Sequence, residues 1–108
     1  MPGKFVVTKK NGKASFSLKA TNGQIIFTSE KYESHAAALK GIESVRKNAA
    51  DDARFERKKA KDGSPYFVLK ARNGESLGRS EMYKTTRSME SGIASVKKNA
   101  VDAAVADA

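Results

Sequence analysis

The first thirty residues alternate apolar and polar side chains in three short runs. Residues 4–10 and 14–20 place apolar side chains such as Phe5 and Leu18 at every second position, which predicts strands with one buried face. An Asn-Gly pair follows each run, and this dipeptide favours the tight turns of β-hairpins. A third run covers residues 24–29. The pattern predicts a three-stranded antiparallel meander.

The period of the pattern changes after Tyr32. Apolar side chains now recur every three or four positions, which is the period of an amphipathic helix with one buried stripe. Ser34 precedes this segment and is a suitable N-cap. We therefore expect a helix whose buried stripe consists of Ala38, Ile42, Val45 and Ala49.

The whole pattern occurs twice. Leu18-Lys19-Ala20, with Asn22-Gly23 after it, returns 51 positions later as Leu69-Lys70-Ala71, with Asn73-Gly74 after it. The predicted helix returns as well, with its stripe at Met89, Ile93, Val96 and Ala100. A repeat of this kind indicates two copies of one supersecondary unit. Repeat one covers about residues 1–50 and repeat two about 51–100, and we expect the tail 101–108 to be frayed.

Two such units should complete each other. A single three-stranded meander with one helix has a thin core and an open edge strand. The joint over residues 48–54 has no Pro/Gly/Ser-rich linker, so the units are not independent beads. We expect one α+β domain over residues 1–108, in which two tandem βββα repeats form one antiparallel sheet. Both helices should pack on one face with pseudo-twofold symmetry, and the chain should be a monomer because the second repeat takes the place of a partner subunit.

The repeated motifs resemble those of the YegP-like family of small bacterial proteins, in its duplicated form. They are an LKAxNG turn, an SExY step and a GIxSVxxNA helix, and the resemblance covers residues 4–100. It implies a βββα unit that assembles in pairs, as two subunits or as tandem copies, and it implies no active site because the family is functionally uncharacterised. The two copies differ modestly: Leu39 becomes Glu90, and Ile25 and Phe27 become Ser76 and Gly78.

The composition leaves little chemistry available. The 108 residues include no Cys and one His, so a zinc site is improbable and disulfides and thiol nucleophiles are impossible. That histidine, His35, has Thr86 as its counterpart in the second copy, and we interpret it as a polar surface residue. No GxGxxG, GxxxxGK[ST] or GxSxG motif occurs. We expect no enzyme activity, no cofactor and no metal.

No apolar run approaches the roughly 20 residues that a membrane span needs. The first ten residues also lack the apolar stretch of a signal peptide. We therefore expect a cytoplasmic protein that does not associate with membranes.

Most residues that occur in both copies have a structural interpretation. Gly41 and Gly92 lie within the predicted helices, where glycine costs about 1 kcal/mol relative to alanine. We interpret them as points of close approach to a neighbouring element, with contact to a ligand as the less favoured alternative. The SExY residues lie between the third strand and the helix of each copy, and a catalytic Ser–Glu–Tyr grouping there would lack a suitable base.

The remaining signal is positive charge. The chain has 21 Lys and Arg against 12 Asp and Glu, a net charge of +9. Part of it gathers in the first hairpin of each copy, at Lys9, Lys10 and Lys13 and at Arg57, Lys58 and Lys59. If Leu18 and Leu69 point inward, the outer face of the sheet carries Lys19 and Lys70 with Tyr66, Val68, Ile25 and Phe27.

Two kinds of function are compatible with this surface. The favoured one is a small non-enzymatic protein-interaction or assembly module that docks a partner, or a second copy of the chain, through the apolar outer patch. The alternative is a weak, sequence-tolerant nucleic-acid-binding module that uses Lys19, Phe27, Tyr66 and Lys70 together with the basic hairpins, since sheet faces with lysines and aromatic rings bind unpaired bases. Lysines also keep small proteins soluble, so charge alone does not decide between them.

Overall fold

The computed structural model describes residues 3–107 and contains the βββα unit twice. The first copy comprises three strands and helix α1, and the second copy comprises three strands and helix α2. A single turn of 3₁₀ helix, η1, joins the copies, and a further strand, β7, follows α2. The elements are β1 (Lys4–Lys10), β2 (Lys13–Lys19), β3 (Ile25–Ser29), α1 (His35–Ala49), η1 (Asp52–Arg54), β4 (Phe55–Lys59), β5 (Pro65–Lys70), β6 (Ser76–Arg79), α2 (Thr86–Asp102) and β7 (Ala104–Asp107).

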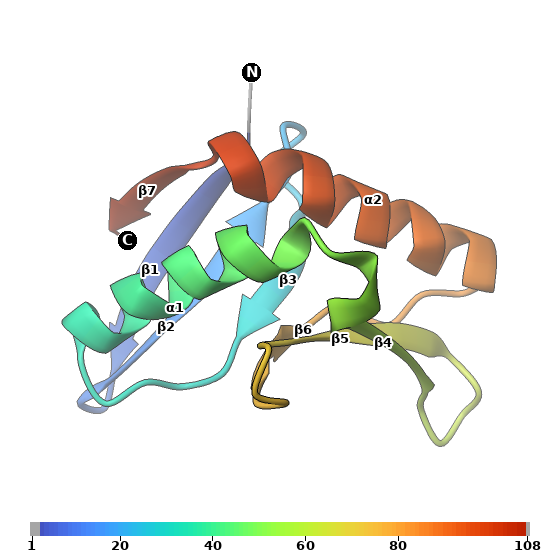
Figure 1. Cartoon of the computed structure of the whole chain (residues 1–108), viewed down its shortest axis with the longest axis horizontal. Coiled ribbons are helices and arrows are strands. Elements are labelled where there is room, and N and C mark those ends of the chain that lie inside the picture. Colours follow the sequence, from blue (N-terminus) through green and yellow to red (C-terminus); the bar gives the residue numbers. More distant parts are fainter. Residues whose placement is uncertain (1–2, 108) are drawn as a thin grey trace.

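The strands form one twisted sheet with the order β4-β5-β6-β3-β2-β1-β7 (Figure 1). The two copies meet where β3 pairs with β6, with Thr28 opposite Arg79 and Ser29 opposite Gly78. On one side of this seam β3 is followed by β2 and then β1, and on the other side β6 is followed by β5 and then β4. The predicted α+β fold, with two tandem repeats in one pseudo-symmetric sheet, is confirmed.

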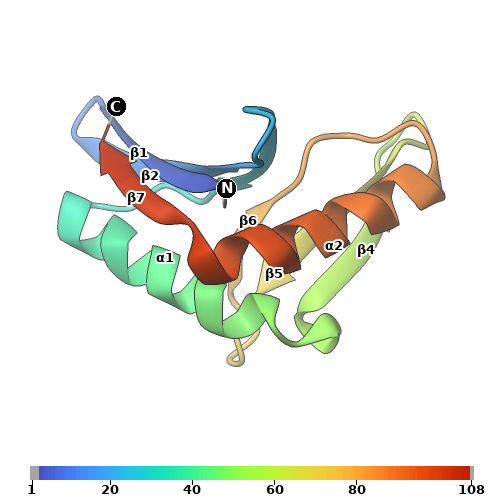
Figure 2. The same cartoon turned by 90° about the horizontal axis from the view of Figure 1, so that it is seen from above.

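One hydrophobic core lies between the sheet and the two helices, which pack on the same side of it (Figures 1 and 2). Both predicted helix stripes are buried, and the fully buried side chains include Phe16 and Phe67 at equivalent positions of β2 and β5. Ser34 and Thr85 cap the helices by accepting hydrogen bonds from the backbone N–H groups of Ala37 and Ser88. Each cap satisfies a donor that the first helical turn leaves free. No helix within residues 3–107 is long and apolar enough to cross a membrane.

The tail is ordered where we expected fraying. Helix α2 continues to Asp102, and β7 pairs with β1 in parallel, with Phe5 opposite Val105 and Val7 opposite Asp107. Edge strands leave backbone groups unpaired, and β7 satisfies those of β1. His35, expected to be only a polar surface residue, contacts this strand through Nε2, 2.7 Å from Oδ1 of Asp107. The sheet is therefore antiparallel only across β1–β6, and Ala108 lies outside the described residues.

Phe27 points into the core, which contradicts its predicted place on the outer face. The pairing of β2 with β3 shifts between Leu18, which is opposite Phe27, and Lys19, which is opposite Ile25. Ile26 is thus an extra residue, and this β-bulge turns Phe27 to the inner face. The ring is fully buried at the seam of the two copies. Its counterpart Gly78 provides the space, because a Cβ there would lie 2.6 Å from Cζ of Phe27.

Candidate binding surface

A groove crosses the outer face of the sheet, the face opposite the helices. Side chains on this face alternate with core residues along each strand, as Tyr66 and Lys70 alternate with Phe67 and Leu69 on β5. The groove has a volume of about 830 Å³ and extends from β4 across β5 and β6 to β3. We call it the outer groove. Its principal lining side chains are Thr28, Lys31, Lys58, Tyr66, Lys70 and Arg79.

The structure brings three of the predicted binding residues together in this groove. Tyr66 and Lys70 line it from β5, and Lys58 lines it from the neighbouring strand β4. Lys19 lies on the same face of the sheet but on β2, opposite Ile25, and is not part of the groove lining. The outer face therefore carries the predicted lysine and tyrosine side chains, concentrated in the second repeat.

A single carboxylate pairs with two of the groove's cations. Glu56 on β4 accepts contacts from Nζ of Lys70 at 2.9 Å and from Nζ of Lys58 at 3.0 Å. These hydrogen bonds lower the pKa of the Glu56 carboxyl below its usual range, and the bond from Lys70 has a larger effect than the bond from Lys58. An anionic ligand in the groove would compete with Glu56 for both ammonium groups.

Arg79 and Lys31 are two groove cations that sequence reasoning missed. Arg79 lies on β6 between Val68 of β5 and Thr28 of β3, at the centre of the sheet. Among residues 3–107 it forms no ion pair. Lys31 lines the groove nearby, as does Glu30, whose Oε2 accepts a hydrogen bond of 2.7 Å from Oγ of Ser76. Arg79 is therefore a central cation available to a ligand.

A difference between the two repeats would have pointed to Arg79. The positions equivalent to Tyr66, Val68 and Arg79 in the first repeat are occupied by Ser15, Ser17 and Thr28. Small hydroxyl side chains thus stand in one copy where an aromatic, an apolar and a cationic side chain stand in the other. The repeated positions build the fold, and the groove is built where the repeats differ.

The apolar outer patch predicted for protein docking is not formed. Phe27 is in the core, and Val68 lies on the outer face but is only 8% exposed. Ile25, on β3, is 43% exposed, and it is the one large aliphatic side chain of the predicted patch that is exposed. The outer face is consequently polar and cationic, and Tyr66 is the one ring of the predicted set that lies there, half-buried.

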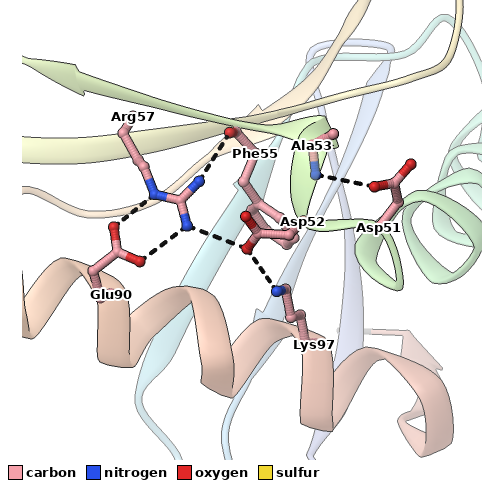
Figure 3. Close-up of polar contacts among 7 residues, drawn as sticks. All are labelled: Asp51, Asp52, Ala53, Phe55, Arg57, Glu90 and Lys97. Atoms are coloured by element: carbon pink, nitrogen blue, oxygen red, sulfur yellow. Dashed lines mark hydrogen bonds and ion pairs between the residues drawn. The ribbon is translucent and has the colours of Figure 1, made fainter.

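Arg57 is not part of a free basic surface, which corrects its predicted role. It points to the helix side, where Nε lies 2.6 Å from Oε2 of Glu90 and Nη2 lies 2.9 Å from Oε1 (Figure 3). Nη2 also contacts Oδ1 of Asp52 at 3.2 Å, and Lys97 reaches the same oxygen at 2.6 Å. Arg57 and Glu90 occupy the positions that Val7 and Leu39 hold in the first repeat, so an ion pair has replaced two apolar residues.

Acid should weaken this cluster. The hydrogen bond from Arg57 holds the pKa of the Glu90 carboxyl below its usual value of 4.5. Because the folded-state pKa is depressed, the stabilisation is fully present above pH 4.5 and is lost as the pH falls through the lower folded-state value. We expect Glu90→Gln to flatten the acid limb of a plot of unfolding midpoint against pH, measured by urea titration between pH 3 and 7. An unchanged acid limb would show that the pair does not contribute.

The two basic hairpins lie at opposite ends of the sheet and do not form one surface. Lys13 is paired with Glu33 at 2.5 Å, and Lys9 lines a small hollow with His35 and Asp107. Lys10 and Lys59 are exposed. β1 and β4 are separated by four strands, and Lys58 is the hairpin cation that lines the outer groove. Lys31 lines both the groove and a separate hollow beside Lys10 and Lys13 of the first hairpin.

The repeated serine and tyrosine residues have structural roles. Oγ of Ser29 accepts a hydrogen bond from the backbone N–H of Phe16, and Oγ of Ser80 accepts one from Phe67, at 2.8 and 3.1 Å. Each hydroxyl then donates to the carbonyl of the glutamate that follows it. Partial burial and the adjacent glutamates raise the pKa of both Tyr32 and Tyr83, which favours neutral phenols.

No cluster of three potential metal ligands occurs within residues 3–107. The outer groove itself presents cations, hydroxyl groups and one aromatic ring.

The family model and the similar sequences all indicate the same protein family. A model described as "Domain of unknown function (DUF1508)" matches residues 9–56 and again residues 60–107. A UPF0339 protein of Bordetella pertussis is 57% identical over 107 residues, covering 99% of this chain and 96% of that protein. The UPF0339 protein YegP of Shigella flexneri is 48% identical over 108 residues, covering 99% and 98%.

Solved structures agree with the fold. The solution NMR structure of the protein of unknown function yegP from E. coli has a TM-score of 0.93 at 47% identity, covering 99% of this chain and 93% of that one. The UPF0339 protein SO3888 from Shewanella oneidensis gives a TM-score of 0.92 at 40% identity, covering 99% and 92%. The chain belongs to the YegP-like UPF0339 family and is built from two DUF1508 repeats.

Proposed function

We propose that this protein is a non-enzymatic, monomeric, cytoplasmic module that binds single-stranded nucleic acid, with little sequence preference, in the outer groove. The observation that carries the proposal is the grouping of Tyr66 with Lys31, Lys58, Lys70 and Arg79 on one concave surface. A ring on which a base can stack and cations that can hold phosphates are the two components of sequence-tolerant single-strand binding.

Different groove residues suit different parts of a nucleotide. The half-buried ring of Tyr66 can stack against a base, which contributes about 1–3 kcal/mol per base in single-strand binders. Arg79 presents a planar guanidinium at the centre of the groove, suited to bidentate contact with a phosphate. Thr28 adds a hydroxyl group that can donate a hydrogen bond to a phosphate or sugar oxygen.

Protein docking through the outer face has less support. That hypothesis depended on an apolar patch including Phe27 and Val68, and both side chains are buried. The charged groups that remain, four cations against Glu30 and Glu56 around the groove, favour an anionic ligand.

The proposal predicts binding that depends steeply on salt. Fluorescence anisotropy with a labelled ten-nucleotide single strand should show affinity falling as salt rises from 50 to 200 mM, because phosphate contacts release counterions. Arg79→Glu should weaken binding and reduce the slope of log K against log salt by about 0.7 for the lost phosphate contact. Lys40→Glu, an equal change of charge on the exposed surface of α1, is the matched control and should retain the slope.

Glu56 provides a test in the opposite direction. Glu56→Gln leaves Lys58 and Lys70 without their carboxylate partner, so it should strengthen binding to the oligonucleotide. Tyr66→Ala should weaken binding at every salt concentration without changing the slope, because it removes stacking rather than charge. Absence of binding at 50 mM salt, or equal effects of Arg79→Glu and Lys40→Glu, would overturn the proposal.

A further inference from the structure

The two edges of the sheet are finished differently, although the repeats that form them are equivalent. At one edge β7 covers β1 in parallel. At the other edge β4 pairs with β5 only, and no further strand within residues 3–107 covers it. Phe5 and Phe55 hold equivalent positions in β1 and β4, the first strands of the two repeats, opposite Leu18 and Leu69. The covered edge therefore shows what kind of strand the open edge can take.

Chain connectivity explains the missing strand. The segment after α2 is free to return and cover the first strand of the other repeat, where it becomes β7. The segment after α1 is η1 and β4 itself, so it already belongs to the sheet. The tandem arrangement thus leaves nothing in the described chain to cover β4.

The covering strand β7 defines the chemistry that fits. It has small apolar residues followed by an acidic one, Ala104-Val105-Ala106-Asp107, and Asp107 shares a hollow with Lys9 and His35. The residue equivalent to Lys9 on the open edge is Lys59, which is exposed and forms no ion pair among residues 3–107. Exposed Lys61 follows it in the β4–β5 turn.

We propose that β4 is a docking edge for an extended acidic peptide of another protein, which adds to the sheet in parallel as β7 does on β1. Main-chain hydrogen bonds provide affinity in such β-strand addition, and side-chain contacts provide selectivity. By analogy with β1 and β7, the register places small residues opposite Arg54–Glu56, the first acidic residue opposite Arg57, and the next acidic residues along Lys58 and Lys59. This site is separate from the outer groove and goes beyond the proposed function.

A synthetic peptide tests this on the full chain. The probe is acetyl-Ala-Val-Ala-Asp-Glu-Asp-amide, whose first four residues repeat the sequence of β7. In ¹⁵N NMR titration we expect shifts centred on the amides of residues 55–59 and slower hydrogen exchange there. Replacing the third residue of the peptide by proline removes a backbone donor and should abolish the shifts. An uncharged version with Asn and Gln should bind several-fold more weakly.

Charge variants of the protein separate this site from the groove. Lys59→Glu should weaken peptide binding by about five-fold, as expected for reversing one exposed ion pair, whereas Lys10→Glu in the other hairpin should not change it. Tyr66→Ala should weaken the oligonucleotide and leave the peptide unaffected, so the two proposals can fail independently. Shifts confined to β1 and β7, shifts in the groove, or no shifts at millimolar peptide would overturn the inference. If no shifts occur, Lys59 and Lys61 would instead be interpreted as charges that prevent pairing with the open edge.

Discussion

Replacing Phe27 by alanine should lower the free energy of unfolding by about 3–5 kcal/mol, the usual cost of removing a buried phenyl ring. The ring is fully buried where β3 meets β6, and the backbone around Gly78 packs directly against it. Within residues 3–107, a cavity at this point would lie at the one strand pairing that joins the meanders of the two repeats. Urea denaturation followed by circular dichroism measures the change.

Ile25 on the same strand provides the matched control. It is also a large apolar residue of β3, but it is 43% exposed on the outer face. Ile25→Ala should change stability by no more than about 0.5 kcal/mol, as is usual for surface substitutions. If both variants lost the same stability, or if Phe27→Ala lost less than Ile25→Ala, the assignment of Phe27 to the core would be wrong.

The pair Phe27 and Gly78 also explains where the internal symmetry must break. Equivalent residues that lie close to a twofold axis compete for the same volume, so two phenylalanines cannot both occupy this seam. Gly78 has a φ of 155°, a region that side-chain-bearing residues rarely adopt, and its missing Cβ leaves room for the ring. One repeat contributes the ring and the other contributes the space.

The period of the hydrophobic pattern was sufficient to predict most of the fold. Alternation along residues 4–10 and 14–20 and the stripes of both helices correspond to the buried residues of the structure. Phe27 was misplaced because a period of two assumes a regular strand, and the bulge at Ile26 inserts a residue into it. Nothing in a single sequence marks a bulge in an otherwise apolar run.

The predicted place of Arg57 in a free basic surface was wrong because it rested on charge alone. A run of basic residues indicates a solvated surface, but β4 alternates, and Arg57 falls on the face that meets α2. The partner that holds it there, Glu90, is 33 positions away in the sequence. Comparing the repeats would have revealed the pair, since Val7 and Leu39 change together to residues of opposite charge.

The candidate binding surface was predictable in part. Tyr66 and Lys70 were placed on the outer face by alternation, and both line the groove. Arg79 and Lys31 were missed because concavity depends on how β6 crosses next to β3, which no local pattern encodes. The tail was missed for the same reason: the strand β7 is stabilised by β1 and by His35, about seventy residues or more before it in the sequence.

Gly41→Ala and Gly92→Ala should each destabilise the protein by about 1–3 kcal/mol, the range for overpacking a core. Glycine to alanine within a helix normally stabilises by about 1 kcal/mol, so the sign itself is informative. A Cβ at residue 41 would lie 2.6 Å from Cζ of Tyr32, and one at residue 92 would lie 2.7 Å from Cζ of Tyr83. Each tyrosine ring is stacked against a buried phenylalanine, which limits its retreat.

Removing the tyrosine ring should reverse the sign. In a Tyr32→Ala background the space above residue 41 is open, so adding Gly41→Ala should be neutral or should stabilise by up to about 1 kcal/mol. The double-mutant cycle therefore predicts a coupling between residues 32 and 41, and the same cycle on residues 83 and 92 repeats the test within one chain. Additive effects in both cycles would mean that glycine occupies these positions for another reason, and contact with a ligand, the less favoured alternative, would become the better interpretation.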